Sequence, residues 1–384
     1  MMSVNSGVKQ LCPNVVHVSS LSGPLCSIDV TDGATVLDLK AAIEIQTGIP
    51  IIEQQLIFRD CVLSDAHSIN SAVLFEVSCS VTLIRASYPC IFALGGSDRP
   101  SAEFYDLSIG AWTSIHHATA IRYGLSAAAD GRLVYIIGGE NTFGIVIDSV
   151  ETFDMVSQSW TRLPDMRQER YNAAAVAWAG QLFVVGGTNN SNNVLGSAEV
   201  LDTLSGSWDE LPALEMPRTG LGLALLLDSI CAVGGLSDEG ESLATVERLN
   251  LVELARRTGR EDRHGGRPRW TPWPSLVVPR YLLAATATAE YMFAIGGKDD
   301  NGCPLSVLEV LSATSSSWAL LPNMSIARHS FSACVVGTAI CVFGGMNSDS
   351  CSLRSAALYS VSEGTWRDLP DMIAARSSFA GAAL

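Results

Sequence analysis

The sequence carries little charge, and very little of its positive charge is lysine. Only 16% of the 384 residues are charged, and three of the 24 basic residues are lysines, Lys9, Lys40 and Lys298. The formal net charge is -15. Because a protein that binds nucleic acid needs a basic face for the phosphates, we expect no nucleic-acid partner.

Long apolar runs and targeting signals are also missing. No apolar run approaches the ~20 residues that a membrane-spanning helix needs, and residues 1–13 lack the basic start and apolar stretch of a signal peptide. The ten cysteines form no Cys-x-x-Cys pair, which argues against metal and disulfide roles. We expect a flexible tail at 1–13, no membrane partner and a cytoplasmic protein, with the nucleus left open as a further compartment.

Six pairs of adjacent glycines are the most regular feature that is present. Each pair ends an apolar run of four or five residues, which is typical of a strand buried on both faces. Two glycines then let the chain turn where a Cβ atom would clash. The pairs are Gly95-Gly96, Gly138-Gly139, Gly186-Gly187, Gly234-Gly235, Gly296-Gly297 and Gly344-Gly345.

An acidic residue, a tryptophan and an arginine follow each glycine pair. The tryptophan and the arginine are ten residues apart in all six copies, whereas the fourth copy has a fourteen-residue insertion between its acidic residue and its tryptophan. In the sixth copy Ala357 stands at the acidic position. The sets are Glu103, Trp112, Arg122; Glu151, Trp160, Arg170; Glu199, Trp208, Arg218; Glu247, Trp270, Arg280; Glu309, Trp318, Arg328; and Ala357, Trp366, Arg376.

This pattern over residues 89–384 resembles the kelch repeat, in which each copy of about 50 residues forms one four-stranded blade of a β-propeller. The resemblance implies a mainly β fold with six blades. The first copy lacks the strand that should precede it, and residues 377–384 are a strand left over, so we predict that they close the ring as the inner strand of the first blade. We predict that the tryptophans pack between blades.

The insertion in the fourth copy has a composition of its own. Residues 253–269 hold six arginines against three acidic residues and almost nothing apolar. We therefore predict a disordered basic loop at 252–269, which is either a tolerated surface insertion or a contact, for an anionic partner or one regulated by phosphorylation.

Residues 14–86 have the pattern of a small α+β unit. Alternating segments predict a hairpin, and Val36, Leu39 and Ile43 predict a helix with one buried face. The succession VLDLKAAI, GIP and QQLIF resembles ubiquitin, which implies a β-grasp domain. Leu21 and Ile57 match the hydrophobic recognition patch of that family. The residues directly after Arg85 are Ala86 and Ser87 and not a terminal Gly-Gly, so we expect no conjugation.

Catalytic signatures are missing from the sequence. No Gly-x-Ser-x-Gly nucleophile elbow or phosphate-binding loop occurs. His116, His117 and His329 have no partner at a metal-ligand spacing. We expect no cofactor, no metal and no enzyme activity; a kelch-fold sugar oxidase or epimerase is the remote alternative.

Together the two resemblances imply a non-catalytic interaction protein. The propeller would hold a client, and the ubiquitin-like domain would contact ubiquitin-ligase or proteasome subunits, as a substrate adaptor in ubiquitin-dependent protein catabolism. Kelch adaptors of cullin ligases usually carry a BTB or F-box domain, and neither is present. The alternative is a scaffold that binds actin or another cytoskeletal partner.

The recurring arginines are the candidate binding residues. Sixfold symmetry predicts that Arg122, Arg170, Arg218, Arg280, Arg328 and Arg376 surround the mouth of the central channel. Either each pairs with an acidic residue of the repeat, or the ring binds an acidic client segment, as in kelch ligase adaptors. Since Ala357 occupies the acidic position of the last copy, we expect Arg376 to lack a partner.

Overall fold

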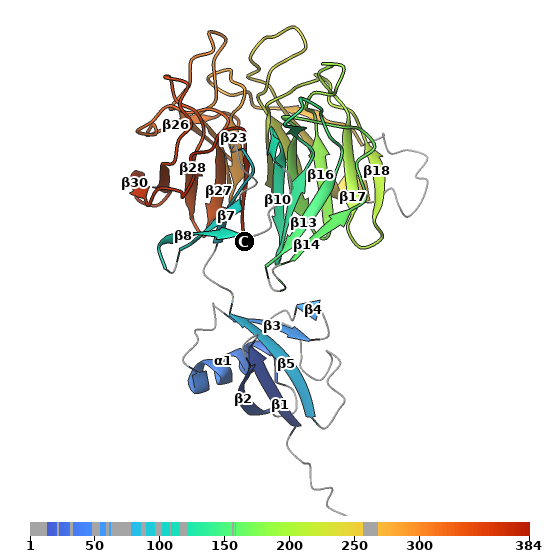
Figure 1. Cartoon of the computed structure of the whole chain (residues 1–384), viewed down its shortest axis with the longest axis vertical. Helices are drawn as coiled ribbons and strands as arrows, with labels where there is room; N and C mark the ends of the chain where they lie inside the picture. The colour runs from blue at the N-terminus through green and yellow to red at the C-terminus, as the bar shows by residue number, and fades with distance from the viewer. Residues whose placement is uncertain are drawn as a thin grey trace, which may run out of the picture. The chain divides into compact units, whose positions relative to one another are not determined.

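A computed structural model describes residues 14–20, 23–30, 34–47, 54–58, 61–62, 78–85, 90–96, 102–107, 109–115, 121–155, 157, 159–255 and 268–384 (Figure 1). The chain divides into two compact units, residues 1–88 and 89–384.

The first unit is a mixed sheet with one helix packed on it. The strand order is β2-β1-β5-β3-β4, and β1 pairs with β5 in parallel. Val36, Leu39 and Ile43 of the helix are buried with Val16, Val18, Ile28, Leu56 and Val81 of the sheet, which confirms the predicted helix face. The elements are β1 (Asn14–Ser20), β2 (Gly23–Val30), α1 (Val36–Thr47), β3 (Gln54–Phe58), β4 (Cys61–Val62) and β5 (Ser78–Arg85).

Helix α1 begins with a reciprocal cap. The backbone N–H and the hydroxyl of Thr35 both donate to Asp38 Oδ2, and the N–H of Asp38 donates back to Thr35 Oγ1. These bonds satisfy donors that the first helical turn leaves without partners, and they place a carboxylate at the positive end of the helix.

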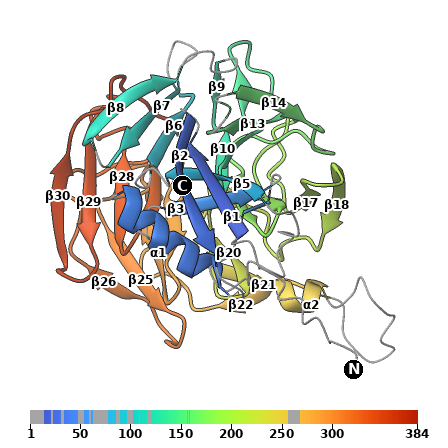
Figure 2. The same cartoon turned by 90° about the horizontal axis from the view of Figure 1, so that it is seen from below.

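The second unit is a propeller of six four-stranded antiparallel sheets, arranged as a ring in Figure 2. We number the blades I to VI in the order of their second strands. Blade I consists of β31 (Ala380–Ala383), β6 (Cys90–Leu94), β7 (Ala102–Asp106) and β8 (Ala111–Ile115). Blade II consists of β10 (Ser126–Asp130), β11 (Leu133–Ile137), β13 (Val150–Asp154) and β14 (Ser159–Leu163), with the small pair β9 (Arg122–Tyr123) and β12 (Glu140–Asn141) beside it.

The other four blades repeat this order. Blade III consists of β15 (Ala174–Trp178), β16 (Gln181–Val185), β17 (Ala198–Asp202) and β18 (Ser207–Leu211). Blade IV consists of β19 (Gly222–Leu226), β20 (Ser229–Val233), β21 (Val246–Asn250) and β22 (Thr271–Trp273). Blade V consists of β23 (Ala284–Ala287), β24 (Tyr291–Ile295), β25 (Leu308–Ser312) and β26 (Ala319–Leu321). Blade VI consists of β27 (Ser332–Val336), β28 (Ala339–Phe343), β29 (Ala356–Ser360) and β30 (Thr365–Leu369).

The ring closes as the sequence predicts. Strand β31 pairs antiparallel with β6, with Ala380 opposite Leu94 and Ala383 opposite Ile91. The six inner strands, rich in alanine and glycine, line a central channel of about 450 Å³. Small side chains suit these strands because they are the most crowded near the axis.

The glycine pairs stand where neighbouring blades come closest. Gly138 has φ of 57°, and a Cβ atom there would lie 2.5 Å from the backbone oxygen of Arg170, which belongs to the next blade. The N–H of Gly139 donates to that same oxygen at 2.8 Å. Glycine is therefore required at both positions, for the positive φ and for the close contact with the backbone oxygen of the next blade.

The insertion in blade IV differs in part from its prediction. Residues 252–255 are helical, within α2 (Leu251–Ala255), because Leu251 is buried in the core between blades III and IV. Residues 256–267 of the predicted loop lie outside the described residues, as does the predicted tail at 1–13, and residues 268 and 269 belong to no helix or strand. None of the described helices is long and apolar enough to cross a membrane.

Candidate functional site

The recurring arginines lie inside the blades and not on a surface. Their exposed fractions run from 0% to 3%, and each one precedes the inner strand of its blade. All six lie within the described residues, and none is among the residues that line the central channel. The prediction that they surround the channel mouth is therefore wrong; their side chains turn back into the sheet.

Five of the six arginines join two strands of their own blade to a glutamate. In blade III, Arg170 Nη1 donates to the backbone oxygens of Gly186 and Ser197 at 2.9 Å each, while Nε and Nη2 donate to Glu199 Oε1 at 3.2 and 2.8 Å. The other oxygen of Glu199 accepts the backbone N–H of Arg167 at 2.8 Å. The side chains thus fix the chain that enters the blade against its second and third strands.

The same ion pair forms in five blades. Burial lowers the pKa of the guanidinium groups of Arg122, Arg170, Arg218 and Arg280, and the paired glutamate opposes that shift. The pairs are Arg122–Glu151, Arg170–Glu199, Arg218–Glu247, Arg280–Glu309 and Arg376–Glu103. This arrangement matches the structural pairing that the sequence left open as one alternative.

Arg376 is paired, contrary to the prediction. It donates from Nε to Glu103 Oε1 at 2.8 Å, because the arginine at the end of one sequence copy enters the next blade around the ring. For the same reason the arginine that faces Ala357 is Arg328, which precedes β27 of blade VI. Among the described residues Arg328 has no carboxylate partner.

The recurring tryptophans connect neighbouring blades, as predicted. In five blades the indole Nε1–H donates to the backbone oxygen of a proline in the preceding blade, at distances of 2.7 to 2.9 Å. The pairs are Trp112–Pro370, Trp208–Pro164, Trp270–Pro212, Trp318–Pro274 and Trp366–Pro322.

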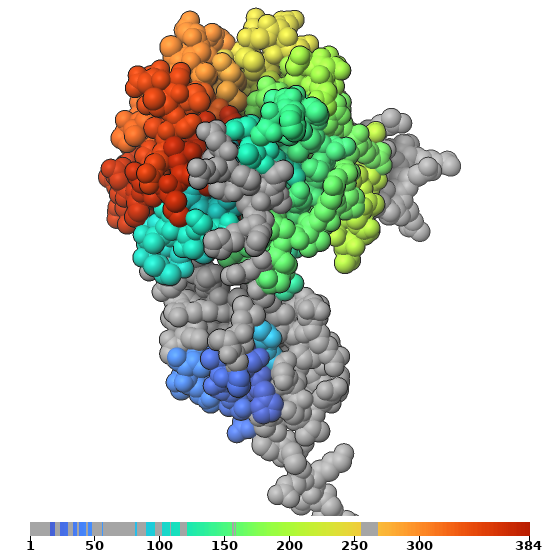
Figure 3. All heavy atoms as spheres, in the orientation of Figure 1, coloured from blue at the N-terminus to red at the C-terminus, as the bar shows by residue number. Residues whose placement is uncertain are grey.

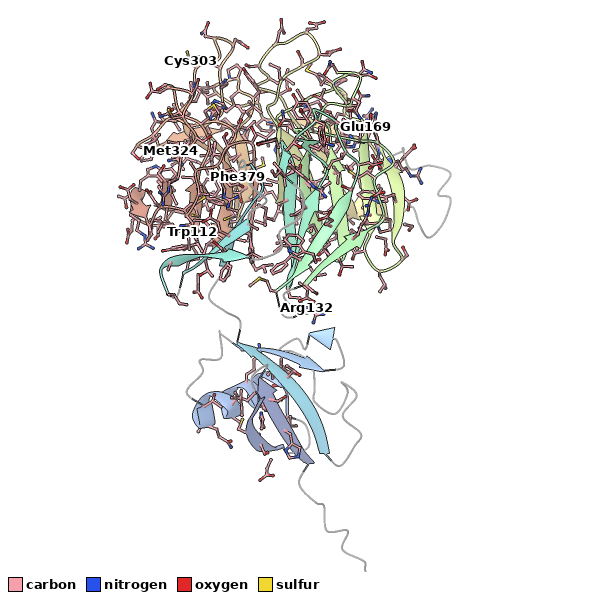
Figure 4. All side chains as sticks on the ribbon, in the orientation of Figure 1. Trp112, Arg132, Glu169, Cys303, Met324 and Phe379 are labelled. Atoms are coloured by element: carbon pink, nitrogen blue, oxygen red, sulfur yellow. The ribbon has the colours of Figure 1, made fainter. Side chains whose placement is uncertain are left out.

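A row of loops projects from one end of the propeller. We call this surface the loop face and define it by residues 140–146, 188–194, 236–242, 298–304 and 346–352. Each loop joins the second strand of a blade to the third. In Figure 4 this end carries Glu169 and Cys303, and Arg132 lies at the opposite end; in Figure 3 orange and yellow atoms form its upper edge.

The loops share one internal frame. In four of them the side chain of the second residue accepts two backbone N–H groups, two and four residues further on: Asn141 from Phe143 and Ile145, Asn189 from Ser191 and Asn193, Asp299 from Asn301 and Cys303, and Asn347 from Asp349 and Cys351. Such bonds hold a turn in one conformation.

Neighbouring loops are also bonded to one another. Asn190 Oδ1 accepts the N–H of Val146 at 2.8 Å, and its Nδ2 donates to the Val146 oxygen at 2.9 Å. Asp300 Oδ1 accepts the N–H of Ser242 at 2.7 Å. These bonds join the loop of blade II to that of blade III and the loop of blade IV to that of blade V.

The tips differ in chemistry although their frame is shared. In blade II, Phe143 is 86% exposed and Ile145 is 51% exposed. Blade III presents a neutral run from 189 to 193, and blades IV to VI expose the carboxylates of Asp238, Glu239, Glu241, Asp300 and Asp349. Sequence reasoning missed this surface because it searched for residues that recur, whereas here only the asparagine, aspartate or serine that frames each turn recurs.

The two residues of the ubiquitin-like patch are not placed together by the structure. Leu21 lies outside the described residues. Ile57 belongs to β3, where its backbone is opposite Thr82 of β5 and Val62 of β4. The patch therefore stays a prediction.

The described side chains form no metal-binding cluster. No group of three or more histidine, cysteine, aspartate or glutamate residues in that part of the chain could hold a metal ion. His329 is buried, and burial together with nearby Lys298 lowers its pKa to about 4. His116 and His117 lie outside the described residues.

Comparison with known proteins agrees with this architecture. Residues 121–167, 169–215, 279–325 and 327–373 match the family described as Kelch motif, and residues 16–75 match the Ubiquitin family. The four kelch matches fall on blades II, III, V and VI; blade I is assembled from distant segments, and blade IV contains the insertion. No curated protein matches the chain.

Among solved structures, one titled "Structure of YjhT" is similar, with a TM-score of 0.61 and 13% sequence identity. The similarity covers 73% of this chain and 94% of that chain, and at this identity it shows the fold alone. The chain is a kelch-repeat β-propeller protein with an N-terminal domain of the ubiquitin family.

Proposed function

We propose that this protein is a non-catalytic recognition module, in which the loop face holds a client protein and the ubiquitin-like domain links the client to the ubiquitin pathway. The link would be to a ubiquitin ligase, as an adaptor, or to the proteasome, as a delivery factor. The observation that carries the proposal is the loop face itself. Its turns share one pattern of internal hydrogen bonds, whereas the residues at their tips differ in chemistry. Loops of variable sequence on a rigid scaffold are a common basis of protein recognition.

The frame of the loops favours binding. A loop that is already ordered loses little conformational freedom when a partner docks, so less of the contact energy is offset. Phe143 is the natural anchor, since exposed aromatic side chains carry much of the energy of protein interfaces. Ile145 in the same loop extends the apolar contact.

The charges of the face indicate the kind of client. Exposed carboxylates on blades IV to VI favour a segment with basic residues beside an apolar group, and such binding weakens as salt rises. The sequence predicted that the six arginines bind an acidic client segment. Five of them do not support that prediction, because their guanidinium groups are buried against glutamates.

The test uses full-length protein with an affinity tag and crosslinking in cell lysate. Phe143→Asp should reduce capture of the client at least tenfold and leave ubiquitin-pathway proteins bound. Leu204→Asp is the matched control, since Leu204 is 98% exposed in the β17–β18 turn, at the end of the propeller opposite the loop face. If Phe143→Asp and Leu204→Asp capture the same proteins as the wild type, the loop face does not bind the client.

The second domain is tested by a reciprocal variant. Ile57→Asp should remove ligase or proteasome subunits from the captured set and leave the client bound. Capture without any ubiquitin-pathway protein, by the wild type as well as by Phe143→Asp, would contradict the adaptor role, and recovery of actin in their place would favour the cytoskeletal alternative.

A further inference from the structure

Blade VI lacks the buried carboxylate that the other five blades contain. Ala357 of β29 occupies the position of Glu103, Glu151, Glu199, Glu247 and Glu309, and it is 6% exposed. The arginine of the blade is nevertheless retained. Arg328 is 1% exposed, and its Nη1 donates to the oxygens of Gly344 and Ser355 at 2.9 and 3.1 Å, as the equivalent arginines do in blades II to V.

Three donors around Ala357 have no acceptor within the described part of the chain. Arg328 Nε is buried without a hydrogen-bond partner, as Arg122 Nε is in blade II. The backbone N–H groups of Ser325 and Ile326 have no backbone acceptor there. In blade V the two equivalent N–H groups, of Val277 and Val278, donate to the two oxygens of Glu309 at 2.7 and 3.1 Å. In blade I those of Ile373 and Ala374 donate to Glu103.

The Ser355 hydroxyl accepts a hydrogen bond from Arg328 Nη2 at 3.1 Å but is neutral, and no anionic side chain of the described residues replaces the missing carboxylate. Cys341 lies near Arg328, but burial raises the pKa of its thiol to about 12, so it is neutral at physiological pH. Asp368 of β30 is opposite Ala357 and exposed, and no described residue forms an ion pair with Arg328. Burial lowers the pKa of Arg328 to about 10, which leaves it charged.

A buried charge without a counterion is strongly destabilising. We propose that blade VI binds a small monovalent anion, chloride or a short carboxylate such as formate, at the position that a glutamate carboxylate occupies in the other blades. Arg328 and the N–H groups of Ser325 and Ile326 are its donors. The two oxygens of the glutamate in blade V show that this set of donors fits a planar carboxylate, and converging N–H donors around a guanidinium also suit a halide.

The first experiment follows the melting temperature of the full-length protein at constant ionic strength. The sodium salt of a bulky anion, gluconate, is replaced stepwise by chloride in one series and by formate in another. We expect the propeller transition to rise by about 2–4 °C in at least one series when the anion reaches roughly ten times its dissociation constant. A response to only one of them identifies which small anion the site accepts.

Two variants make this test specific. Ala357→Glu supplies the missing carboxylate, so it should melt higher than the wild type in gluconate and should not respond to chloride or formate. Glu199→Ala creates the same gap in blade III, so it should melt lower in gluconate and recover part of the loss with the small anion. An equal response of wild type and Ala357→Glu would overturn the proposal, as would a wild type that responds to neither anion.

A direct measurement covers the case in which a variant does not fold. Relaxation of ³⁵Cl in solutions of the wild-type protein should show excess line broadening that formate displaces. Arg328→Met, which removes the charge and keeps the apolar stem, should abolish that excess. Broadening that persists in Arg328→Met would place the chloride elsewhere and refute the site.

Discussion

Arg376 and Glu103 form a buried ion pair across 273 positions of sequence, with Arg376 Nε 2.8 Å from Glu103 Oε1. Both side chains are 1% exposed. The pair joins the residue that leads into β31 to the third strand of the same blade. It therefore fastens the two distant segments that together make blade I.

The closing strand should be essential for a monomeric propeller. Deleting residues 377–384 removes β31, leaves the edge of β6 without its partner and takes Phe379, Ala380 and Ala382 out of the core. We expect aggregation and a loss of the cooperative melting transition, because an open apolar edge pairs with other chains. Size-exclusion chromatography with light scattering and a thermal melt measure both effects.

A synthetic peptide of residues 377–384 provides the control for this deletion. Added in excess, it should restore part of the monomer fraction, and a scrambled peptide should not. A truncated protein that stays monomeric with an unchanged melting temperature would show that β31 is dispensable.

The arginine–glutamate pairs should behave as buried charges. Glu309→Ala leaves Arg280 charged and buried, so the free energy of unfolding should fall by about 3–5 kcal/mol. The double variant Arg280→Met with Glu309→Leu should recover part of this loss. Denaturation by urea in a low-chloride buffer gives both values.

The exposed pair Arg162–Asp165 is the comparison, with side chains 66% and 39% exposed. There Asp165→Ala should change the free energy of unfolding by less than about 1 kcal/mol. If Glu309→Ala and Asp165→Ala cost the same, burial does not govern these pairs.

The interblade tryptophan bonds should contribute measurably to stability. Trp318 is 5% exposed and its indole donates to the Pro274 oxygen at 2.7 Å. Trp318→Phe leaves that buried oxygen without this donor and removes part of the packing, so we expect a loss of about 1–3 kcal/mol in the free energy of unfolding. Trp178, which is 38% exposed, is the matched site, where a change to Phe should cost less than about 0.5 kcal/mol. Equal losses at the two sites would be evidence against the role assigned to Trp318.

Buried His329 should make stability depend on pH. Its pKa is lowered from 6.5 to about 4, chiefly by burial, so the unfolded chain takes up the proton first as the pH falls. The stabilisation from the neutral ring is therefore complete above pH about 6.5 and is lost as the pH falls toward 4. We expect the free energy of unfolding to decrease by roughly 1–3 kcal/mol across that window.

The variant His329→Gln separates this effect from the titration of carboxylates. Urea denaturation at several pH values between 4 and 7 should show a flatter dependence for the variant than for the wild type. Parallel curves for the two proteins would assign the pH dependence to other groups.

Much of the fold could be predicted from recurring residues. Six glycine pairs located the second strands. The unpartnered segment at 377–384 predicted the closure, because every blade of a closed ring needs four strands and the first copy lacked one. The partner of Arg376 could not be assigned in the same way. A blade is built from two consecutive copies, so counting within a copy set Arg376 against Ala357 and not against Glu103.

The loop face shows a different limit of sequence reasoning. The frame residues Asn141, Asn189, Asp299 and Asn347 recur, yet their backbone bonds become visible only in three dimensions. The tips between them share no residue type, so no repeat draws attention to Phe143. The direction of the arginine side chains could not be read from the sequence either. Each arginine precedes an inner strand, and this position was wrongly interpreted as exposure at the mouth of the channel.

The pairing of β31 with β6 also sets the order in which the propeller can be completed during synthesis. Translation delivers β6, β7 and β8 first, and blades II to VI can each finish once their own four strands have left the ribosome. Blade I must wait until residues 380–383 emerge. Throughout that interval the nascent chain is an open arc with the edge of β6 accessible, so chaperones and proteases can distinguish an unfinished molecule from a finished one by a single unpaired strand.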